Sequence, residues 1–365
     1  MQNQQFASLD HIVEHNNINL NLKSASLQEP QQKHGKVVCG AIALFIIVLL
    51  LVIALVISIA LVFTIGVKAT RSDESSNTAN STSTILPVSP LFEPCNCGCP
   101  SVEPLFSDET AAATARIVNG ETARAHSWPW QILLVMYDPE TKLEYRCGAT
   151  LLTQRHVLTA AHCVHGFFPP YMVLFSGQHA RNLSISLIDV RVVNKVYIHE
   201  SYNSHAHNDL AILTTEEPFR FDTYVSPICL ATPNSLLLQA NEELVAIGWG
   251  RISGQPETFI YPEYLQQVKV AYVPASNCSR ILEPTTVLHP GQMCAGRPGH
   301  NACSGDSGGP LMRRMRLANT GTYYWQQMGV ASLSKDCGWN STWPDIYVNI
   351  PYYYDWIMAT VKRAV

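Results

Sequence analysis

The sequence predicts an all-β domain that begins at Ile117 and follows a single membrane-spanning helix. Beyond residue 117 the apolar residues come in short alternating runs, such as 131–136 and 244–248, separated by Gly and Pro turns. Runs of this kind predict short, half-buried strands, and many in succession predict either two β-barrels or a β-sandwich. One helix is expected at the C-terminus, after Pro351, because five residues share one of its faces: Tyr353, Trp356, Ile357, Thr360 and Val361.

The first 116 residues divide into three parts by composition. Residues 1–36 are rich in Gln and Asn with no sustained apolar period, which predicts a disordered cytoplasmic tail. Residues 37–67 carry no charge and exceed the roughly 20 apolar residues that span a bilayer. Residues 68–116 begin with a Ser, Thr and Asn stretch followed by prolines, which predicts an extended extracellular stalk and propeptide.

The apolar segment is interpreted as a signal-anchor helix. The alternative is a cleaved secretory signal, but such signals have a shorter apolar core near the N-terminus, and no small-residue cleavage site stands out here. Three lysines precede the segment, whereas the two basic residues that follow it are offset by Asp73 and Glu74. This bias favours a cytoplasmic N-terminus and hence a single-pass type II protein of the cell membrane, with residues 117–365 outside.

Ten of the eleven cysteines follow the apolar segment, which suits an oxidising compartment. Cys95, Cys97 and Cys99 form a cluster for which zinc ligation is one interpretation, but their alternate spacing and location favour disulfides. Four Asn-x-Ser/Thr motifs agree with an extracellular location and predict glycosylation: Asn80, Asn182, Asn277 and Asn340.

Three short motifs carry residues suited to acyl transfer. A serine hydroxyl is a weak nucleophile, so it needs a nearby base and a third group that orients the base. Leu-Thr-Ala-Ala-His-Cys supplies His162, Asn-Asp-Leu-Ala-Ile-Leu supplies Asp209, and Gly-Asp-Ser-Gly-Gly-Pro supplies Ser307. Each residue alone has a simpler structural explanation, but the three motifs together predict catalysis.

With these motifs, residues 117–365 resemble the catalytic domain of the chymotrypsin-like serine proteases, in that family's His, Asp, Ser order. The preceding segments make the whole chain similar to the type II transmembrane members. The resemblance implies a double six-stranded β-barrel with a C-terminal helix and a triad between the barrels. It also implies that the N–H groups of Gly305 and Ser307 form an oxyanion hole, where one donor contributes ~3 to 4 kcal/mol. A binding protein that kept the fold without catalysis is the competing class.

The resemblance further implies a zymogen. Arg116-Ile117-Val118-Asn119-Gly120 is similar to the family's activation site, where cleavage after the basic residue frees the Ile117 amino group. Asp306 is the expected partner of that new cation, because a buried unpaired carboxylate costs several kcal/mol.

The family's cysteine spacing implies three disulfides within the domain: Cys147–Cys163, Cys278–Cys294 and Cys303–Cys337. Cys229 is left over, and the resemblance implies that it pairs with Cys95, Cys97 or Cys99. Such a bond would keep the severed propeptide on the catalytic domain.

The substrate pocket departs from the trypsin-like pattern. Asn301 stands where those members have a carboxylate, and Ser332-Leu333-Ser334 replaces Ser-Trp-Gly at the rim. Asp345 falls on the pocket wall, where it either receives a cation or is a solvated loop acid. We therefore expect a mixed or large apolar preference before the cut, with basic residues accepted through Asp345.

Protein and peptide substrates, an activating protease, protein inhibitors and the lipid bilayer are the expected partners. The net charge of −4 and the lack of a long basic tract exclude nucleic acid. No cofactor fingerprint is present, and residues 177–190 lack the acidic pair with which some relatives bind calcium, so we expect no cofactor and no metal.

Overall fold

The computed structural model describes, with gaps, part of the predicted stalk and propeptide and most of the domain that follows it. The described ranges are residues 96–107, 120–182, 189–203, 207–235, 237–252, 260–282, 288–299, 302–317, 321–334 and 343–364. The predicted tail and membrane segment lie outside these ranges. No helix within them is long and apolar enough to cross a membrane.

Six strands close the first barrel in the order β2-β3-β4-β7-β6-β5. Strand β2 closes the ring by pairing with β5, where Leu133 faces Phe175. The predicted strand at 131–136 is buried at every position, because its outer face is covered as well as its inner one. The strands are β2 (Gln131–Asp138), β3 (Leu143–Thr153), β4 (His156–Thr159), β5 (Met172–Ser176), β6 (Asp189–Ile198) and β7 (Ala211–Thr215).

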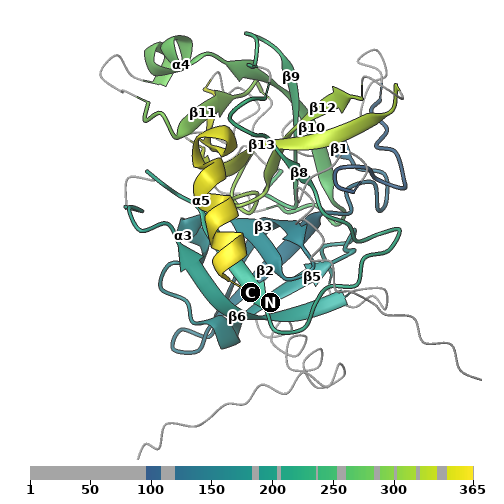
Figure 1. The fold of residues 1–365 in the computed structure, drawn as a ribbon, viewed down its shortest axis with the longest axis vertical. Helices are drawn as coiled ribbons and strands as arrows, with labels where there is room; N and C mark the ends of the chain where they lie inside the picture. The colour runs from purple at the N-terminus through teal and green to yellow at the C-terminus, as the bar shows by residue number, and fades with distance from the viewer. Residues whose placement is uncertain are drawn as a thin grey trace, which may run out of the picture. The chain divides into compact units, whose positions relative to one another are not determined.

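A second ring of six strands closes in the order β9-β10-β11-β14-β13-β12, because β9 pairs with both β10 and β12. Two short strands attach to it: β1 (Glu121–Thr122) on β10 and β8 (Cys229–Leu230) on β13. The protein therefore has two barrels and not a sandwich (Figure 1). The ring strands are β9 (Glu243–Gly248), β10 (Gln266–Val273), β11 (Gln292–Ala295), β12 (Pro310–Arg316), β13 (Tyr323–Leu333) and β14 (Asp345–Asn349).

The predicted C-terminal helix is present as α5 (Ile350–Arg363), with Pro351 in its first turn. It contacts β13 of the second barrel and β7 of the first, so it links the two (Figure 1). Four of the five expected face residues are buried: Tyr353, Ile357, Thr360 and Val361.

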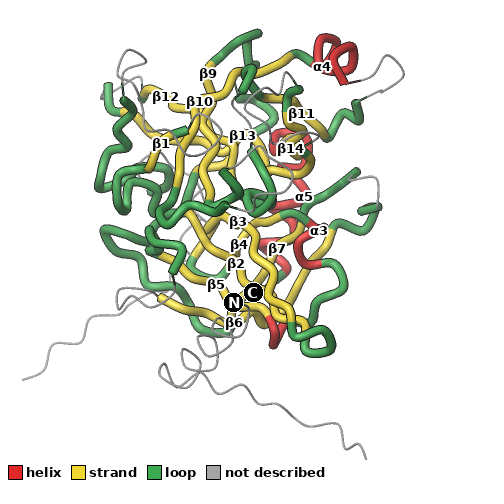
Figure 2. Tube along the Cα trace, turned by 180° about the vertical axis from the view of Figure 1, so that it is seen from behind, coloured by secondary structure: helices red, strands yellow, loops and turns green. Residues whose placement is uncertain are grey.

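Two further helices and a 3-10 turn were not expected from the sequence. Helix α3 (Ala161–Val164) follows β4, and the 3-10 turn η1 (Pro169–Tyr171) precedes β5. Helix α4 (Ala275–Leu282) lies in the β10–β11 connection, on the periphery of the second barrel (Figure 2).

One continuous apolar core extends through both barrels. Trp130, just before β2, is fully buried and its Nε1 lies 3.1 Å from the Met312 sulfur of the second barrel. The Gly148 amide of β3 donates to the Ser307 carbonyl over 2.8 Å. The barrels are thus joined by both packing and hydrogen bonds where their loops meet.

Residues 96–107 lie against the second barrel. The Gly98 amide donates to the Pro227 carbonyl over 2.8 Å, and the Gly98 carbonyl accepts from the Trp325 amide over 2.7 Å. Gly98 has φ +69°, and a Cβ there would lie 2.1 Å from the Trp325 oxygen, so only glycine fits. Phe106 packs edge-on against Trp128, with ring centroids 6.5 Å apart.

Candidate active site

His162 and Asp209 are held together by two hydrogen bonds. His162 lies on α3, and Asp209 lies just before β7 with its side chain fully buried. Asp209 Oδ1 accepts from the His162 amide over 2.8 Å, and Oδ2 accepts from the imidazole Nδ1 over 2.7 Å. Because Nδ1 donates to the carboxylate, Nε2 is left as the proton acceptor of the ring.

Ser332 and Asn208 hold the His162–Asp209 pair in place. The motifs alone did not indicate this supporting role. Ser332 Oγ donates to Asp209 Oδ2 over 2.5 Å. Asn208 adopts φ +55° and is tied at both ends of its side chain, by the Tyr353 hydroxyl at 2.8 Å and the Ser201 carbonyl at 2.8 Å. Helix α5 thereby fixes the residue that precedes Asp209.

Ser307 lies in a tight turn that leads into β12. The adjacent Gly308 has φ +80°, and a Cβ there would lie 2.2 Å from Thr159 Oγ1 and 2.3 Å from the Gly148 carbonyl oxygen. Gly308 also donates to the Ala331 carbonyl over 2.8 Å. The turn is thus packed against both barrels, which fixes the backbone at Ser307.

Two backbone amides beside Ser307 are available for a ligand. Gly305 has φ +103°, which favours glycine. Within the described ranges, neither the Gly305 amide nor the Ser307 amide donates a hydrogen bond. Both residues line the cavity described next, so the two N–H groups are candidates for binding an anionic oxygen.

His162 and Ser307 line one cavity of about 780 Å³, together with Gly305 and the Cys147–Cys163 disulfide. No hydrogen bond joins the Ser307 hydroxyl to the His162 ring in the described structure. In enzymes without bound substrate such a bond is often long or poorly aligned, so the geometry is compatible with a nucleophile and its base.

Asp306 is buried and accepts two backbone hydrogen bonds, from Gly250 over 2.7 Å and from Cys303 over 2.9 Å. Burial raises the pKa of the Asp306 carboxyl to about 6, against the opposing effect of these two bonds. Among the described residues no cation pairs with it. Both Arg116 and Ile117 lie outside the described ranges.

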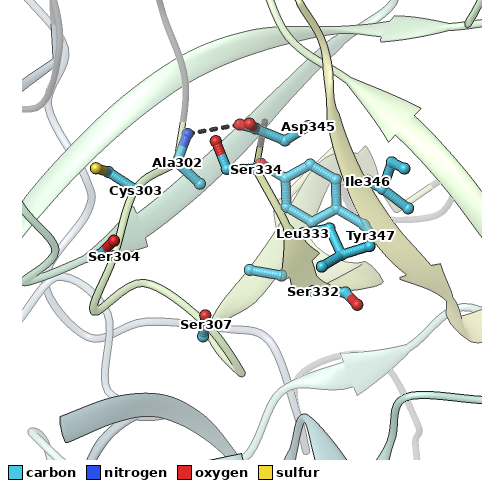
Figure 3. A pocket seen from close by; sticks show the side chains of 11 residues that line it. Ala302, Cys303, Ser304, Ser307, Ser332, Leu333, Ser334, Asp345, Ile346 and Tyr347 are labelled. Carbon is cyan, nitrogen blue, oxygen red and sulfur yellow. Dashed lines mark hydrogen bonds between the residues drawn. The ribbon is translucent and has the colours of Figure 1, made fainter. Parts of the chain in front are cut away.

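A second cavity, of about 200 Å³, opens beside Ser307 and is bounded by the rim residues Ser332, Leu333 and Ser334 (Figure 3). Asp345 lies in its wall, is only 2% exposed and accepts from the Ala302 amide over 2.6 Å. The alternative of a solvated loop acid is therefore wrong, because Asp345 begins strand β14. Asn301 lies outside the described ranges.

Tyr347 also lines this smaller cavity and was not singled out from the sequence. Its side chain is fully buried, and its hydroxyl has no hydrogen-bond partner among the described residues. Burial raises the pKa of Tyr347 well above its usual value, and the neighbouring carboxylates of Asp345 and Asp306 add to the effect.

The disulfides agree with the pairing that the resemblance implied. The structure forms Cys147–Cys163 and Cys278–Cys294, and it joins Cys229 to Cys97. Cys303 is disulfide-bonded, while its expected partner Cys337 and the stalk residue Cys95 lie outside the described residues.

The described residues contain one group of three close His, Cys, Asp or Glu side chains, namely Cys147, His162 and Cys163. Its two sulfurs are joined as a disulfide, so they are not the thiolates that zinc requires. Two expected glycosylation residues, Asn182 and Asn277, are exposed, which is compatible with a glycan; Asn80 and Asn340 lie outside the described residues.

Comparison with known proteins gives a consistent result. The family model described as Trypsin matches residues 117–357. The chain is 34% identical to chymotrypsin-C of Rattus norvegicus and 33% identical to that of Bos taurus, over 73% and 72% of this chain and 94% and 92% of those proteins. It is also 30% identical to ovochymase of Halocynthia roretzi, over 73% of this chain but only 16% of the length of ovochymase.

Proposed function

Because the chain belongs to the trypsin family of serine endopeptidases, we propose that Ser307, His162 and Asp209 are the triad with which it hydrolyses peptide bonds. The observation that carries this assignment is the doubly hydrogen-bonded Asp209, which binds Nδ1 of His162, while His162 and Ser307 line the same cavity.

In this mechanism, Ser307 Oγ attacks the carbonyl carbon while His162 Nε2 takes the hydroxyl proton. Asp209 stabilises the imidazolium that forms. The negative oxygen of the tetrahedral intermediate is bound by the free N–H groups of Gly305 and Ser307. His162 then gives its proton to the leaving amine. Water takes the place of the amine and attacks the acyl carbon while His162 accepts its proton, and His162 returns that proton to Ser307 Oγ as the acid leaves.

Labelling of Ser307 tests the assignment. An active-site phosphonate should label protein that has been cleaved after Arg116, and Ser307→Ala should abolish labelling and lower kcat by at least about 10⁴-fold. Cleaved protein that hydrolyses no peptide, or a Ser307→Ala variant that stays active, would contradict the triad. The first of these results would instead favour a cell-surface binding protein.

The protein is further proposed to be made as a zymogen that is cleaved between Arg116 and Ile117. The support is Asp306, a buried carboxylate with two amide donors and, within the described ranges, no cation. An ammonium from the new Ile117 N-terminus would compensate this charge and draw the adjacent Gly305–Ser307 backbone into its working shape. Arg116→Gln should therefore leave the protein nearly inactive, and full activity of that uncut variant would refute the switch.

A type II membrane anchor is proposed for residues 37–67, with the stalk at 68–116 and the catalytic domain outside the cell. The support is the uncharged apolar run, the slight basic bias before it and the disulfide-bonded cysteines after it. Carbonate extraction of membranes tests it: the protein should stay in the pellet, and release into the supernatant would contradict an anchor.

Asp345 is proposed to set the preference for the residue before the cut. Its carboxylate lies in the wall of the cavity beside Ser307, where it can receive a cation, while Tyr347 and Ile346 offer apolar surface to a large side chain. We accordingly propose a mixed preference for large apolar and basic residues at this position.

A further inference from the structure

The 780 Å³ cavity on the His162 side of Ser307 carries an uneven set of charges. The lining residues with a carboxylate, guanidinium or imidazole side chain are Glu144, Arg146, His162 and Arg181. Two guanidinium groups thus face a single carboxylate, and the remaining lining includes aromatic rings such as those of Phe167 and Tyr261.

Arg146 is already engaged. Its Nε lies 2.5 Å from Glu144 Oε1, and its Nη1 donates to the Arg181 carbonyl over 3.1 Å. The Glu144 carboxylate therefore compensates the charge of Arg146, and Arg146 in turn holds the backbone of Arg181 in place.

Arg181 is the cation of this cavity that forms no ion pair within the described ranges. Its guanidinium lies over the Tyr261 ring, 4.4 Å from the centroid, and within the described part of the chain no carboxylate forms an ion pair with it. Burial, together with the nearby positive charge of Arg146, lowers the pKa of Arg181 to about 10, against the opposing effect of the Glu144 carboxylate. Arg181 is still charged at neutral pH, but its charge is poorly solvated, so a bound anion would stabilise it.

The position of His162 indicates which half of a substrate enters this cavity. His162 lines the larger cavity and does not line the smaller one that contains Asp345. Since the imidazole must give its proton to the leaving amine, the amine half of the substrate extends along the His162 side. This step rests on the proposed triad.

We propose that the cavity binds a carboxylate on the amine side of the scissile bond and that Arg181 is the residue that selects it. The carboxylate comes from a Glu or Asp side chain within the first few residues after the cut, or from the C-terminus of a short peptide. Planar guanidinium groups bind carboxylates with two parallel hydrogen bonds, and stacking on Tyr261 pre-orients this one.

Matched internally quenched peptides test this selection on the full-length, processed protein. All share the acyl-side sequence that the enzyme cuts best and carry Glu or Gln at each of the first three positions after the cut, with amidated C-termini. The Glu peptide should have a kcat/KM about ten-fold above its Gln counterpart at one of these positions, as expected for one charge-assisted hydrogen bond. The same peptides as free acids show whether a C-terminal carboxylate serves equally well.

The variants make the assignment specific to Arg181. In Arg181→Gln the Glu-to-Gln ratio should fall to about one, whereas Arg181→Lys should keep part of it because the cation remains. Arg124→Gln, a change at an exposed arginine outside this cavity, should leave the ratio as in the wild type. A ratio within each variant does not depend on how much of that variant folds.

An aminocoumarin amide with no residue after the cut separates this inference from the triad. If the processed protein does not hydrolyse it, the proposed function fails. If it is hydrolysed but no carboxylate, side-chain or terminal, changes kcat/KM by more than two-fold, carboxylate selection is refuted. A Glu preference that persists unchanged in Arg181→Gln refutes the role of Arg181.

Discussion

Ser332 Oγ donates a hydrogen bond of 2.5 Å to Asp209 Oδ2, the carboxylate oxygen that also accepts a hydrogen bond from His162 Nδ1. The rim of the substrate pocket and the proposed triad are therefore connected directly. Because Ser332 comes from β13 and Asp209 lies just before β7, the bond also crosses from the second barrel to the first.

Removing this hydroxyl should slow the chemical step. Ser332→Ala leaves the buried Asp209 with one donor fewer, and hydrogen bonds to charged groups contribute roughly 1.5 to 3 kcal/mol. We expect kcat to fall about ten-fold or more in steady-state assays. Ser334→Ala is the matched control, because it lines the same cavity without bonding to Asp209, and it should change KM more than kcat. Equal kcat in wild type and Ser332→Ala would refute a role for this bond.

Gly250 makes room for the Asp306 carboxylate. A Cβ at Gly250 would lie 2.3 to 2.5 Å from the carboxylate atoms of Asp306, so the acid must move. Gly250→Ala should lower the free energy of unfolding by about 1 to 3 kcal/mol, the usual cost of overpacking, and should impair activation after cleavage. Denaturant unfolding and a peptide assay on cleaved protein measure the two effects.

Gly166 provides the matched glycine control. It has φ +90°, but nothing lies within 4 Å of a methyl group added at that position, so Gly166→Ala tests backbone strain alone. Activation should survive in this variant. Normal activation of Gly250→Ala would show that Asp306 needs no such space.

Asp306 should make the uncut protein less stable as the pH rises. Its pKa is raised from 3.8 to about 6 in the folded state, so the folded protein binds the proton more tightly than the unfolded chain does. The stabilisation is complete below pH 3.8 and is lost as the pH rises through 6. The difference between the two pKa values, 6 − 3.8, corresponds to about 3 kcal/mol in the free energy of unfolding.

Urea unfolding of the uncut Arg116→Gln protein at pH 4 and pH 7, with disulfides intact, measures this loss. Asp306→Asn in the same background should remove about 3 kcal/mol of the pH dependence. In cleaved protein the Ile117 ammonium should reverse the trend. An Asp306→Asn variant with the pH dependence of its parent would show that Asp306 does not titrate in this window.

The sequence predicted strands and left the choice between two barrels and a sandwich open, because that choice depends on remote pairings. Leu133 of β2 closes its ring on Phe175 of β5, and no local periodicity reports such a contact. Helix α4 was not predicted because it is short and contains Ser and Asn, which are weak helix formers. The Cys278–Cys294 disulfide, a contact between distant parts of the sequence, fixes it to β11.

The motifs located His162, Asp209 and Ser307, and the resemblance placed Ser332 at the pocket rim, but neither predicted the Ser332–Asp209 bond or Arg181 in the larger cavity. Ser332 bonds to Asp209 across 123 positions, and Arg181 meets Arg146 across 35. Such contacts follow from the closure of the barrels, so the local sequence around either residue does not predict them. From the sequence alone Arg181 cannot be told from a surface arginine, yet it lines the larger cavity.

The Cys97–Cys229 disulfide should keep the cleaved propeptide attached to the catalytic domain. After cleavage at Arg116, the processed protein should migrate as one band without reductant and as two with it. In Cys97→Ala/Cys229→Ala the two chains should separate in denaturant without reductant; uncut Arg116→Gln is the control that stays single throughout. Release of the wild-type catalytic domain without reduction would contradict this pairing.

Asp345 should determine whether basic residues are accepted at the position before the cut. Its carboxylate is buried in the cavity wall and is oriented by the Ala302 amide, so a substrate cation would meet a fixed, partly desolvated anion. Asp345→Asn keeps the shape and removes the charge, and it should lower kcat/KM for Arg and Lys peptides by about ten-fold or more while sparing those with large apolar residues. A peptide library profiled with both proteins measures this, and an identical profile would remove Asp345 from substrate recognition. The same result decides how the protein is activated: if Arg peptides depend on Asp345, loss of that charge should also stop any self-cleavage after Arg116.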